Sequence, residues 1–239
     1  MKRPSRNSAA GLAACLLAGV CVSAAAFPLS ETGSSVRDVR GFDRVDLTIH
    51  GELILTQGDT ESLEIEASPS DLALITTAVR GTTLHIGQVS PGPGPRGPVT
   101  YRLAMKRIAG LATTSSGNIR AASVEADSLR IALSSSGQIV IDRLAARMLD
   151  VTLSSSGDCT VAGTVDRQSV QLSSSGDYRA ENLACRRASV GVSSSGSATV
   201  RVSESLDARI SSSGSVRYRG SPPNVTSHAS SSGRLIRLD

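Results

Sequence analysis

The most frequent candidates for a reactive side chain in this sequence are serines, which recur in short runs that end in glycine. A serine hydroxyl becomes a nucleophile when a base such as histidine lies within hydrogen-bond reach. The three histidines, His50, His85 and His228, do not follow the repeat, and the sequence has no Gly-x-Ser-x-Gly elbow. We therefore interpret the serines as structural, and we predict no catalytic residues and no cofactor-binding residues.

Two aspartates that directly follow turn glycines are the candidates for a cation site. Asp158 and Asp177 occupy the same position in neighbouring copies of the repeat, so their like charges would lie close together. Calcium would relieve that repulsion, but a hard cation needs six or more oxygen ligands. The Gly-Gly-x-Gly-x-Asp repeat of calcium-binding solenoids is absent. We favour solvated turn residues over calcium and predict no metal site.

Charged pairs between the copies are the remaining candidates for catalysis. Polysaccharide-cleaving β-helices gather acidic and basic groups in one cleft beside aromatic platforms, whereas this chain has three Tyr, two Phe and no Trp. The charged corner residues form no obvious cluster, and such runs usually make a solvated face. We predict a non-enzymatic protein. The corner residues are Asp142, Arg143, Asp166, Arg167, Arg186 and Arg187.

The spacing of the Ser-Ser-Gly element predicts the fold. Its glycines are 20, 20, 19, 20, 18 and 19 residues apart, and apolar residues alternate with polar ones on both sides of each glycine. Alternation with period two is typical of strands with one buried face. A unit this short must stack on its neighbours. We predict an all-β, right-handed parallel β-helix or solenoid of about 19–20 residues per repeat. The structural turn residues are Gly117, Gly137, Gly157, Gly176, Gly196, Gly214 and Gly233.

The turn residues suit tight corners that repeat in register. Glycine adopts positive φ without a Cβ clash, and stacked serines can form hydroxyl ladders or bond the turn backbone. Cys159 falls two residues after its glycine and is expected to point inward, whereas Cys185 falls in a corner. Because the two cysteines differ in phase, we favour two buried thiols over a disulfide.

The sequence divides into a less regular and a more regular part. Residues 37–110 contain strand patterns that predict irregular early coils capping the solenoid, with a short helix expected at 71–79 and a Pro-Gly loop at 91–98. Residues 111–239 hold the regular repeats, and 37–239 are expected to form one domain. The Ser221–Asn224 corner is a candidate start of a C-terminal cap.

Residues 1–26 are typical of a secretory signal peptide. A basic start precedes the apolar run 9–22, and Ala24–Ala26 fits cleavage before Phe27. Leu12–Cys15 also resembles a lipobox, although we favour plain cleavage. Three of the 25 Lys and Arg residues and none of the 21 Asp and Glu residues lie in this segment, so the mature chain carries about +1. That balance argues against nucleic acid as a partner. We expect no transmembrane segment in the mature chain.

The layout of residues 37–239 resembles the bacterial family called putative auto-transporter adhesin, head GIN domain. The resemblance rests on the Phe42-Asp-Arg-Val45 strand start, the 47–65 strand series, the Gly81–Ile86 element and the serial Ser-Gly turns, of which Ser116–Ile119 matches best. It implies a right-handed β-helix-like fold and a place in the periplasm, on the outer-membrane surface or outside the cell.

Three function classes remain open from the sequence. The first is a binding or adhesin-like module of the cell envelope, with a cell-surface glycan or protein as its partner. The second is an envelope structural protein that forms homo-oligomers through its solenoid ends. The third is a carbohydrate-active β-helix enzyme. Fold alone does not choose among them.

Overall fold

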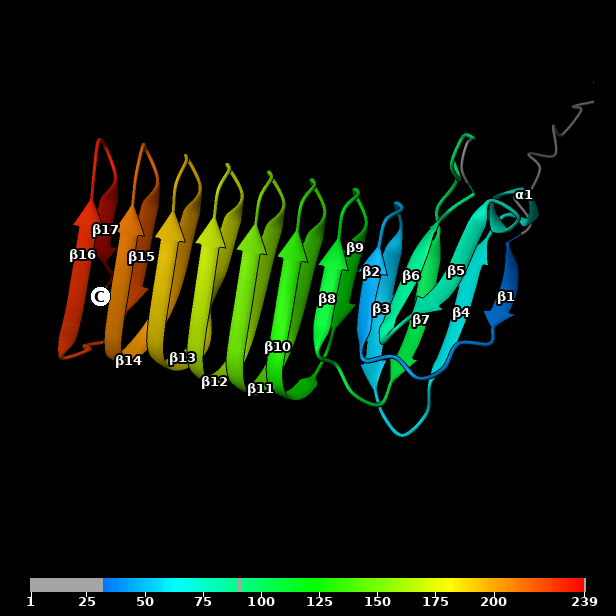
Figure 1. Ribbon diagram of the computed structural model, residues 1–239, viewed down its shortest axis with the longest axis horizontal. Helices are drawn as coiled ribbons and strands as arrows, with labels where there is room; N and C mark the ends of the chain where they lie inside the picture. The colour runs from blue at the N-terminus through cyan, green and yellow to red at the C-terminus, as the bar shows by residue number, and fades with distance from the viewer. Residues whose placement is uncertain (1–31, 90–91, 239) are drawn as a thin grey trace, which may run out of the picture. The chain divides into compact units, whose positions relative to one another are not determined.

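The computed structural model describes residues 32–89 and 92–238. These residues belong to one compact unit whose 17 strands pair in a continuous ladder that coils on itself (Figure 1). The predicted all-β parallel solenoid is therefore confirmed. The expected signal peptide at 1–26 and the lipobox at Cys15 lie outside the described residues.

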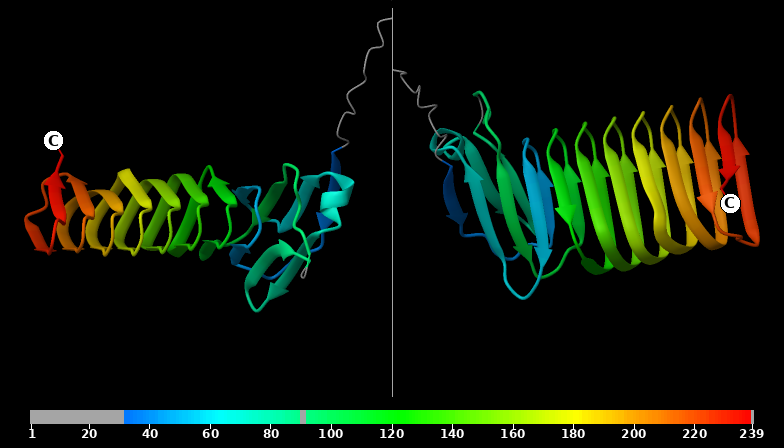
Figure 2. Two further views of the ribbon diagram at one scale, coloured as in Figure 1. Left: turned by 90° about the horizontal axis from the view of Figure 1, so that it is seen from above. Right: turned by 180° about the vertical axis from the view of Figure 1, so that it is seen from behind.

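Each regular coil has one strand before a Ser-Ser-Gly turn and one strand after it. We call the two stacked faces the pre-turn sheet and the post-turn sheet (Figures 1 and 2). The chain ascends the pre-turn sheet and descends the post-turn sheet while advancing, which is a right-handed winding (Figure 1). Four strands bend around the corners and contribute to both sheets: β11 (Gln138–Leu153), β12 (Asp158–Leu172), β13 (Asp177–Val192) and β14 (Ser197–Ile210).

Parallel pairing in register aligns the inward side chains of successive coils into columns. One column of the pre-turn sheet joins equivalent aliphatic residues of neighbouring strands, and a second column lines the post-turn sheet. All of these side chains are buried. The first column is Leu133, Leu153, Leu172, Val192 and Ile210, and the second is Ile119, Ile139, Cys159, Tyr178, Ala198 and Val216.

The first coil lies between two coils that come later in the chain. It consists of β2 (Arg44–Leu47) and β3 (Glu52–Gln57). Strand β2 pairs with both β6 (Thr83–Gln88) and β8 (Gly110–Thr113), and β3 pairs with both β7 (Thr100–Met105) and β9 (Asn118–Ala121). After β7, the chain therefore passes over the first coil before the regular repeats begin.

Antiparallel strands cover the N-terminal end of the stack. Strand β4 (Ser62–Ala67) pairs with β1 (Gly33–Arg37) and β7, and β5 (Ile75–Arg80) pairs with β6. Helix α1 spans only Pro69–Leu72. The helix expected at 71–79 was wrong, because residues 75–79, four of which are β-branched, belong to β5 instead.

The C-terminal repeats continue the coil. Strands β10 (Val124–Leu133), β15 (Ser215–Arg219), β16 (Asn224–Ala229) and β17 (Arg234–Arg237) follow the same scheme. The Ser221–Asn224 corner leads into β16, which pairs with β14, and β17 pairs with β15. Residues 224–237 thus add another coil at the place where the sequence indicated a cap.

The turn glycines are required for a reason other than the one we expected. Their φ angles are not positive, and the positive-φ glycines lie elsewhere, at corners such as Gly163 and Gly220. A Cβ placed on Gly157 would lie 2.5 Å from the carbonyl oxygen of Ser135 in the preceding turn. Close stacking of successive turns, rather than left-handed backbone, excludes a side chain here.

The turn serines also bond between coils. The first serine hydroxyl of two turns donates to a backbone carbonyl of the preceding coil: Ser154 Oγ to Leu133 O at 3.4 Å and Ser193 Oγ to Leu172 O at 3.3 Å. The hydroxyls of Ser154 and Ser193 therefore have structural hydrogen-bond partners.

Candidate functional site

The histidines lie apart from the serine turns. His85 Nδ1 lies 3.3 Å from Asp46 Oδ2 on the pre-turn sheet, and His50 Nε2 lies 3.2 Å from the carbonyl oxygen of Gly97. The third, His228, is exposed on β16. Across residues 32–89 and 92–238, no hydrogen bond joins a histidine to a serine hydroxyl. The structure therefore assembles no serine–histidine pair among these residues.

The two aspartates that were weighed as a cation site and interpreted as solvated turn residues share an arginine. Arg179 donates to Asp158 Oδ2 at 3.0 Å and to Asp177 Oδ2 at 2.7 Å. Asp158 Oδ1 also accepts the backbone N–H of Asp177. The guanidinium supplies a positive charge between the two carboxylates, and its pKa is raised by Asp158 and Asp177. Within the described part of the chain, no group of His, Cys, Asp or Glu residues is arranged to hold a metal ion.

A groove crosses five neighbouring strands of the pre-turn sheet. We call it the pre-turn groove; its volume is about 420 Å³. Two columns of outward side chains line it in register along the solenoid axis, one beginning at Met148 and the other at Asp150. The columns are Met148, Arg167, Arg187, Ser205 and Asn224, and then Asp150, Ser169, Ser189, Asp207 and Thr226.

The dimensions and lining of the groove suit a long ligand. Five strands span roughly 19 Å at a spacing of about 4.8 Å. Charged and hydroxyl groups recur at that spacing, and Met148, 44% exposed, offers an apolar contact at one end. A repeating row of hydrogen-bonding groups along a groove of this length can contact an extended ligand at several points.

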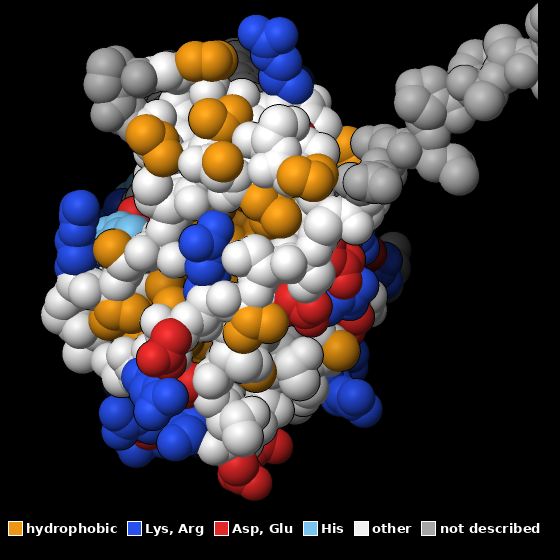
Figure 3. Space-filling model, turned by 90° about the vertical axis from the view of Figure 1, so that its right-hand side faces the viewer, with side chains coloured by type: hydrophobic (Ala, Val, Ile, Leu, Met, Phe, Trp, Pro, Cys, Tyr) orange, Lys and Arg blue, Asp and Glu red, His pale blue; other side chains and the backbone are white. Residues whose placement is uncertain are grey.

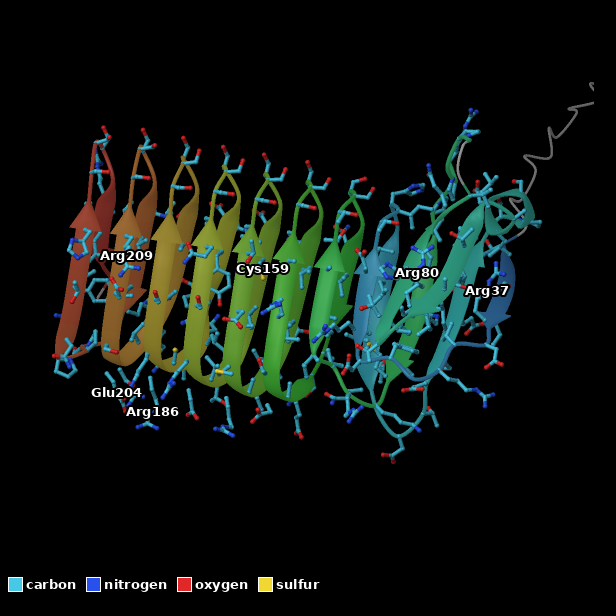
Figure 4. The ribbon with its side chains drawn as sticks, in the orientation of Figure 1. Arg37, Arg80, Cys159, Arg186, Glu204 and Arg209 are labelled. Atoms are coloured by element: carbon cyan, nitrogen blue, oxygen red, sulfur yellow. The ribbon has the colours of Figure 1, made fainter. Side chains whose placement is uncertain are left out.

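A three-residue ion cluster separates this groove from a second hollow at the corner. Glu204 accepts a hydrogen bond from Arg186 at 2.6 Å and forms an ion pair with Arg187 at 3.1 Å. Arg186 and Glu204 project together from the corner (Figure 4). The hydrogen bond from Arg186, aided by Arg187, lowers the pKa of Glu204. Arg187 lines the pre-turn groove, whereas Arg186 lines the second hollow of about 540 Å³ with Arg201. Glu204 therefore holds the guanidinium group of Arg187 at the edge of the pre-turn groove and that of Arg186 at the edge of the second hollow.

The interior beneath the groove contains an unusual polar contact. Gln168 stands in a column otherwise occupied by Leu129, Leu149, Ala188 and Leu206. Its side chain accepts from the hydroxyl of the buried Tyr178, while its Nε2 has no partner. Both cysteines are free and buried close by, and burial raises the pKa of each thiol. Cys159 faces inward as expected, and Cys185 donates to the carbonyl of Arg187 at 3.0 Å.

The Pro-Gly loop is fastened to the N-terminal coils by one carboxylate. Asp71 accepts the backbone N–H groups of Arg96 and Gly97, each at 3.1 Å, and the hydroxyl of Ser68 at 2.9 Å. The Arg96 and Ser68 bonds lower the pKa of Asp71 most strongly. This arrangement is structural, since it holds the loop between β6 and β7.

Sequence reasoning placed two groove residues, Arg167 and Arg187, among scattered corner charges. It missed Met148, Ser169 and Ser189 as lining residues. The signal that was available is the outward phase on the strand before each turn. The turn glycines, named as structural residues, all lie at the opposite edge from the corners, where the loops between the sheets stack (Figure 1).

Comparison with known proteins identifies the family of this chain. Residues 41–222 match the family model described as "Putative auto-transporter adhesin, head GIN domain". No curated protein matches the chain. Within residues 32–89 and 92–238, no helix is long and apolar enough to cross a membrane.

Solved structures share the fold at low sequence identity. A structure described as a putative adhesin from Bacteroides fragilis has a TM-score of 0.83 at 22% identity, covering 88% of this chain and 99% of that one. One described as a putative lipid binding protein from Parabacteroides distasonis has a TM-score of 0.74 at 22% identity, covering 88% and 98%. A putative adhesin from Parabacteroides merdae has a TM-score of 0.64 at 16% identity, covering 88% and 98%.

Proposed function

Because this chain belongs to the family described as putative auto-transporter adhesin, head GIN domain, we propose that it is an exported, non-enzymatic, adhesin-like binding module of the cell surface. Its domain spans residues 37–239. Its ligand is an elongated cell-surface glycan, held in the pre-turn groove across successive strands.

The regular lining of the groove carries this proposal. Side chains that donate and accept hydrogen bonds stand in two registered columns across five strands. A glycan presents hydroxyl groups at regular intervals along its length, so a repeating scaffold can bind several units with the same contacts. The naming of similar structures as adhesins supports a binding role.

The ion cluster supports selective binding at the corner edge of the groove. Glu204 fixes Arg187 in place, and Arg187 and Arg167 occupy one column on adjacent strands. Fixed guanidinium groups bind carboxylates and phosphates in a bidentate manner. Glycans that place an acidic group beside Arg167 and Arg187, away from the column that contains Asp150 and Asp207, are therefore expected to bind more tightly than neutral ones.

A glycan array probed with the labelled protein tests the proposal. We expect binding to a set of elongated glycans, enriched in acidic ones, together with no release of reducing sugar on prolonged incubation. Reducing-sugar release would assign the chain to the carbohydrate-active enzymes instead. Absence of glycan binding would contradict the proposed ligand class.

The exported state is tested separately by mass spectrometry of the chain from cell fractions. The proposal requires a mature N-terminus at Phe27. A lipid-modified Cys15 would replace plain cleavage by membrane anchoring, and an intact Met1 in the cytoplasm would contradict export.

A further inference from the structure

The outer edge of the last coil is an unpaired strand edge. Strand β16 pairs with β14 on one side, and among the described residues no strand pairs with its other side. All six of its side chains are exposed, including the inward-phased Val225 at 41%. An edge of this kind is a template for another strand.

The direction of the free hydrogen-bonding groups follows from one bond. The N–H of Ser230 donates to the carbonyl of Ile210 at 2.9 Å, so even-numbered residues of this segment turn their backbone groups toward β14. Because these groups alternate along a strand, Val225, Ser227 and Ala229 turn theirs toward the open edge. Three consecutive ladder positions are thus free of pairing.

Basic side chains predominate at this end of the solenoid, although Arg209 pairs with Asp207 at 3.0 Å and Arg219 lies 3.9 Å from Glu181. From residue 208 to residue 238 the chain has five arginines and a histidine but no Asp or Glu. Arg237 donates to Ser221 and Arg217 to Ser197, so neither is neutralised by a carboxylate through these bonds. The opposite end of the solenoid differs, since acidic and basic side chains are mixed on it (Figure 3). The arginines are Arg209, Arg217, Arg219, Arg234 and Arg237.

From these observations we propose that the outer edge of β16 binds an extended acidic segment of a partner protein by strand addition. Only a polypeptide backbone can complete the free ladder, which excludes a lipid headgroup as the main contact. A second copy joined tail to tail through this edge would bring two basic ends together. Apolar residues of the added strand would cover the inward positions beside Val225, and the acidic residues between them would lie beside His228, one strand away from the ion pair of Arg209 with Asp207. This surface is the edge of the sheet, and the proposal does not depend on the glycan groove.

A peptide-binding measurement tests this proposal. The probe is a fluorescein-labelled peptide that alternates valine and glutamate, followed by anisotropy. The matched probes alternate valine and lysine, or carry the acidic sequence with every peptide nitrogen methylated. We expect binding of the acidic probe only, weakening as salt is raised because the attraction is electrostatic. The methylated probe has no backbone N–H donors, so equal binding of this probe to the unmodified protein would overturn strand addition.

A pair of variants at one position locates the contact. Ser227→Pro removes a backbone donor from the open edge, where proline is tolerated in strands, whereas Ser227→Ala retains that donor. We expect Ser227→Pro to weaken peptide binding by about tenfold or more, and Ser227→Ala to change it by less than about twofold, with glycan binding unchanged in both. Equal affinity of both variants would overturn the site. So would binding of anionic vesicles without peptide binding, or self-association that blocks the probe.

Discussion

The hydroxyl of Tyr178 donates a hydrogen bond of 2.8 Å to Oε1 of Gln168 inside the solenoid. Both side chains are buried, and the Nε2 group of Gln168 has no partner. The pair joins the pre-turn and post-turn sheets through their shared core. It is also a weak point, because an amide that is only partly satisfied costs free energy in an apolar interior.

The contribution of this pair can be measured by a double-mutant cycle. Tyr178→Phe leaves the amide without its remaining bond, and we expect it to lower the free energy of unfolding by about 1–3 kcal/mol. Adding Gln168→Leu restores the aliphatic column and should recover most of the loss. Urea unfolding provides the values. If Tyr178→Phe proves as stable as the wild type, the bond does not matter to folding.

The turn glycines should be intolerant of even one methyl group. Gly157→Ala places a Cβ against the carbonyl oxygen of Ser135, and overpacking of this kind costs about 1–3 kcal/mol. Gly58→Ala is the matched control, since a Cβ there meets nothing within 4 Å. Thermal and urea unfolding distinguish them. Equal stability of the two variants would contradict the close stacking of turns.

The loop held by Asp71 should respond to acid. Hydrogen bonds from Arg96 and Ser68 hold the pKa of Asp71 below its ordinary value. A carboxyl with a depressed folded pKa stabilises the fold above its unfolded pKa of about 3.9, and that stability is lost as pH falls through the folded value. Asp71→Asn should therefore melt lower than the wild type at neutral pH, with the difference shrinking below about pH 4.

The control for this loop is Asp59→Asn, at an exposed position. It should follow the wild-type melting curve at every pH. Hydrogen exchange supplies a local measure, because the amides of Arg96 and Gly97 should exchange faster in Asp71→Asn at neutral pH. Unchanged exchange there would mean that other contacts hold the loop.

The two cysteines should be inert in the folded protein. Both are free and buried, and burial raises their pKa, which disfavours the reactive thiolate. The processed chain should react with a thiol reagent such as DTNB only after unfolding, and then at two sites. Rapid reaction of the native protein would contradict the buried core. Absence of thiols after unfolding without reductant would reveal a disulfide.

The regular half of the fold could be predicted because the inward and outward positions of each strand follow from the distance in sequence to the nearest turn glycine. The residues two and four positions after a turn glycine lie on the same side of a strand. The burial of Ile139 and Val161 could therefore be predicted from their distance to the nearest turn glycine. Partner choice in the first half is not local. The apolar pattern of β2 indicates a strand, but nothing in it specifies that β6 and β8 are its neighbours.

The groove escaped prediction because the corners differ in length. Arg167 is ten residues after Gly157, whereas Arg187 is eleven after Gly176. The register shifts between Thr160 and Gly163 bring these two arginines side by side nonetheless. Counting positions from the glycines therefore placed Arg167 and Arg187 in different phases, whereas the structure aligns them on adjacent strands. The calcium hypothesis had a similar limit, because the phase of Asp158 and Asp177 did not reveal that Arg179 reaches both carboxylates.

The affinity of one array-selected glycan for two variants tests the binding account most directly. Ser169→Trp fills the pre-turn groove from β12, and Thr160→Trp places the same side chain on the outer face of the post-turn sheet of that strand. We predict that Ser169→Trp weakens binding by about tenfold or more, whereas Thr160→Trp binds like the wild type. Unchanged affinity of Ser169→Trp, or equal loss in both variants, would contradict the groove as the binding site.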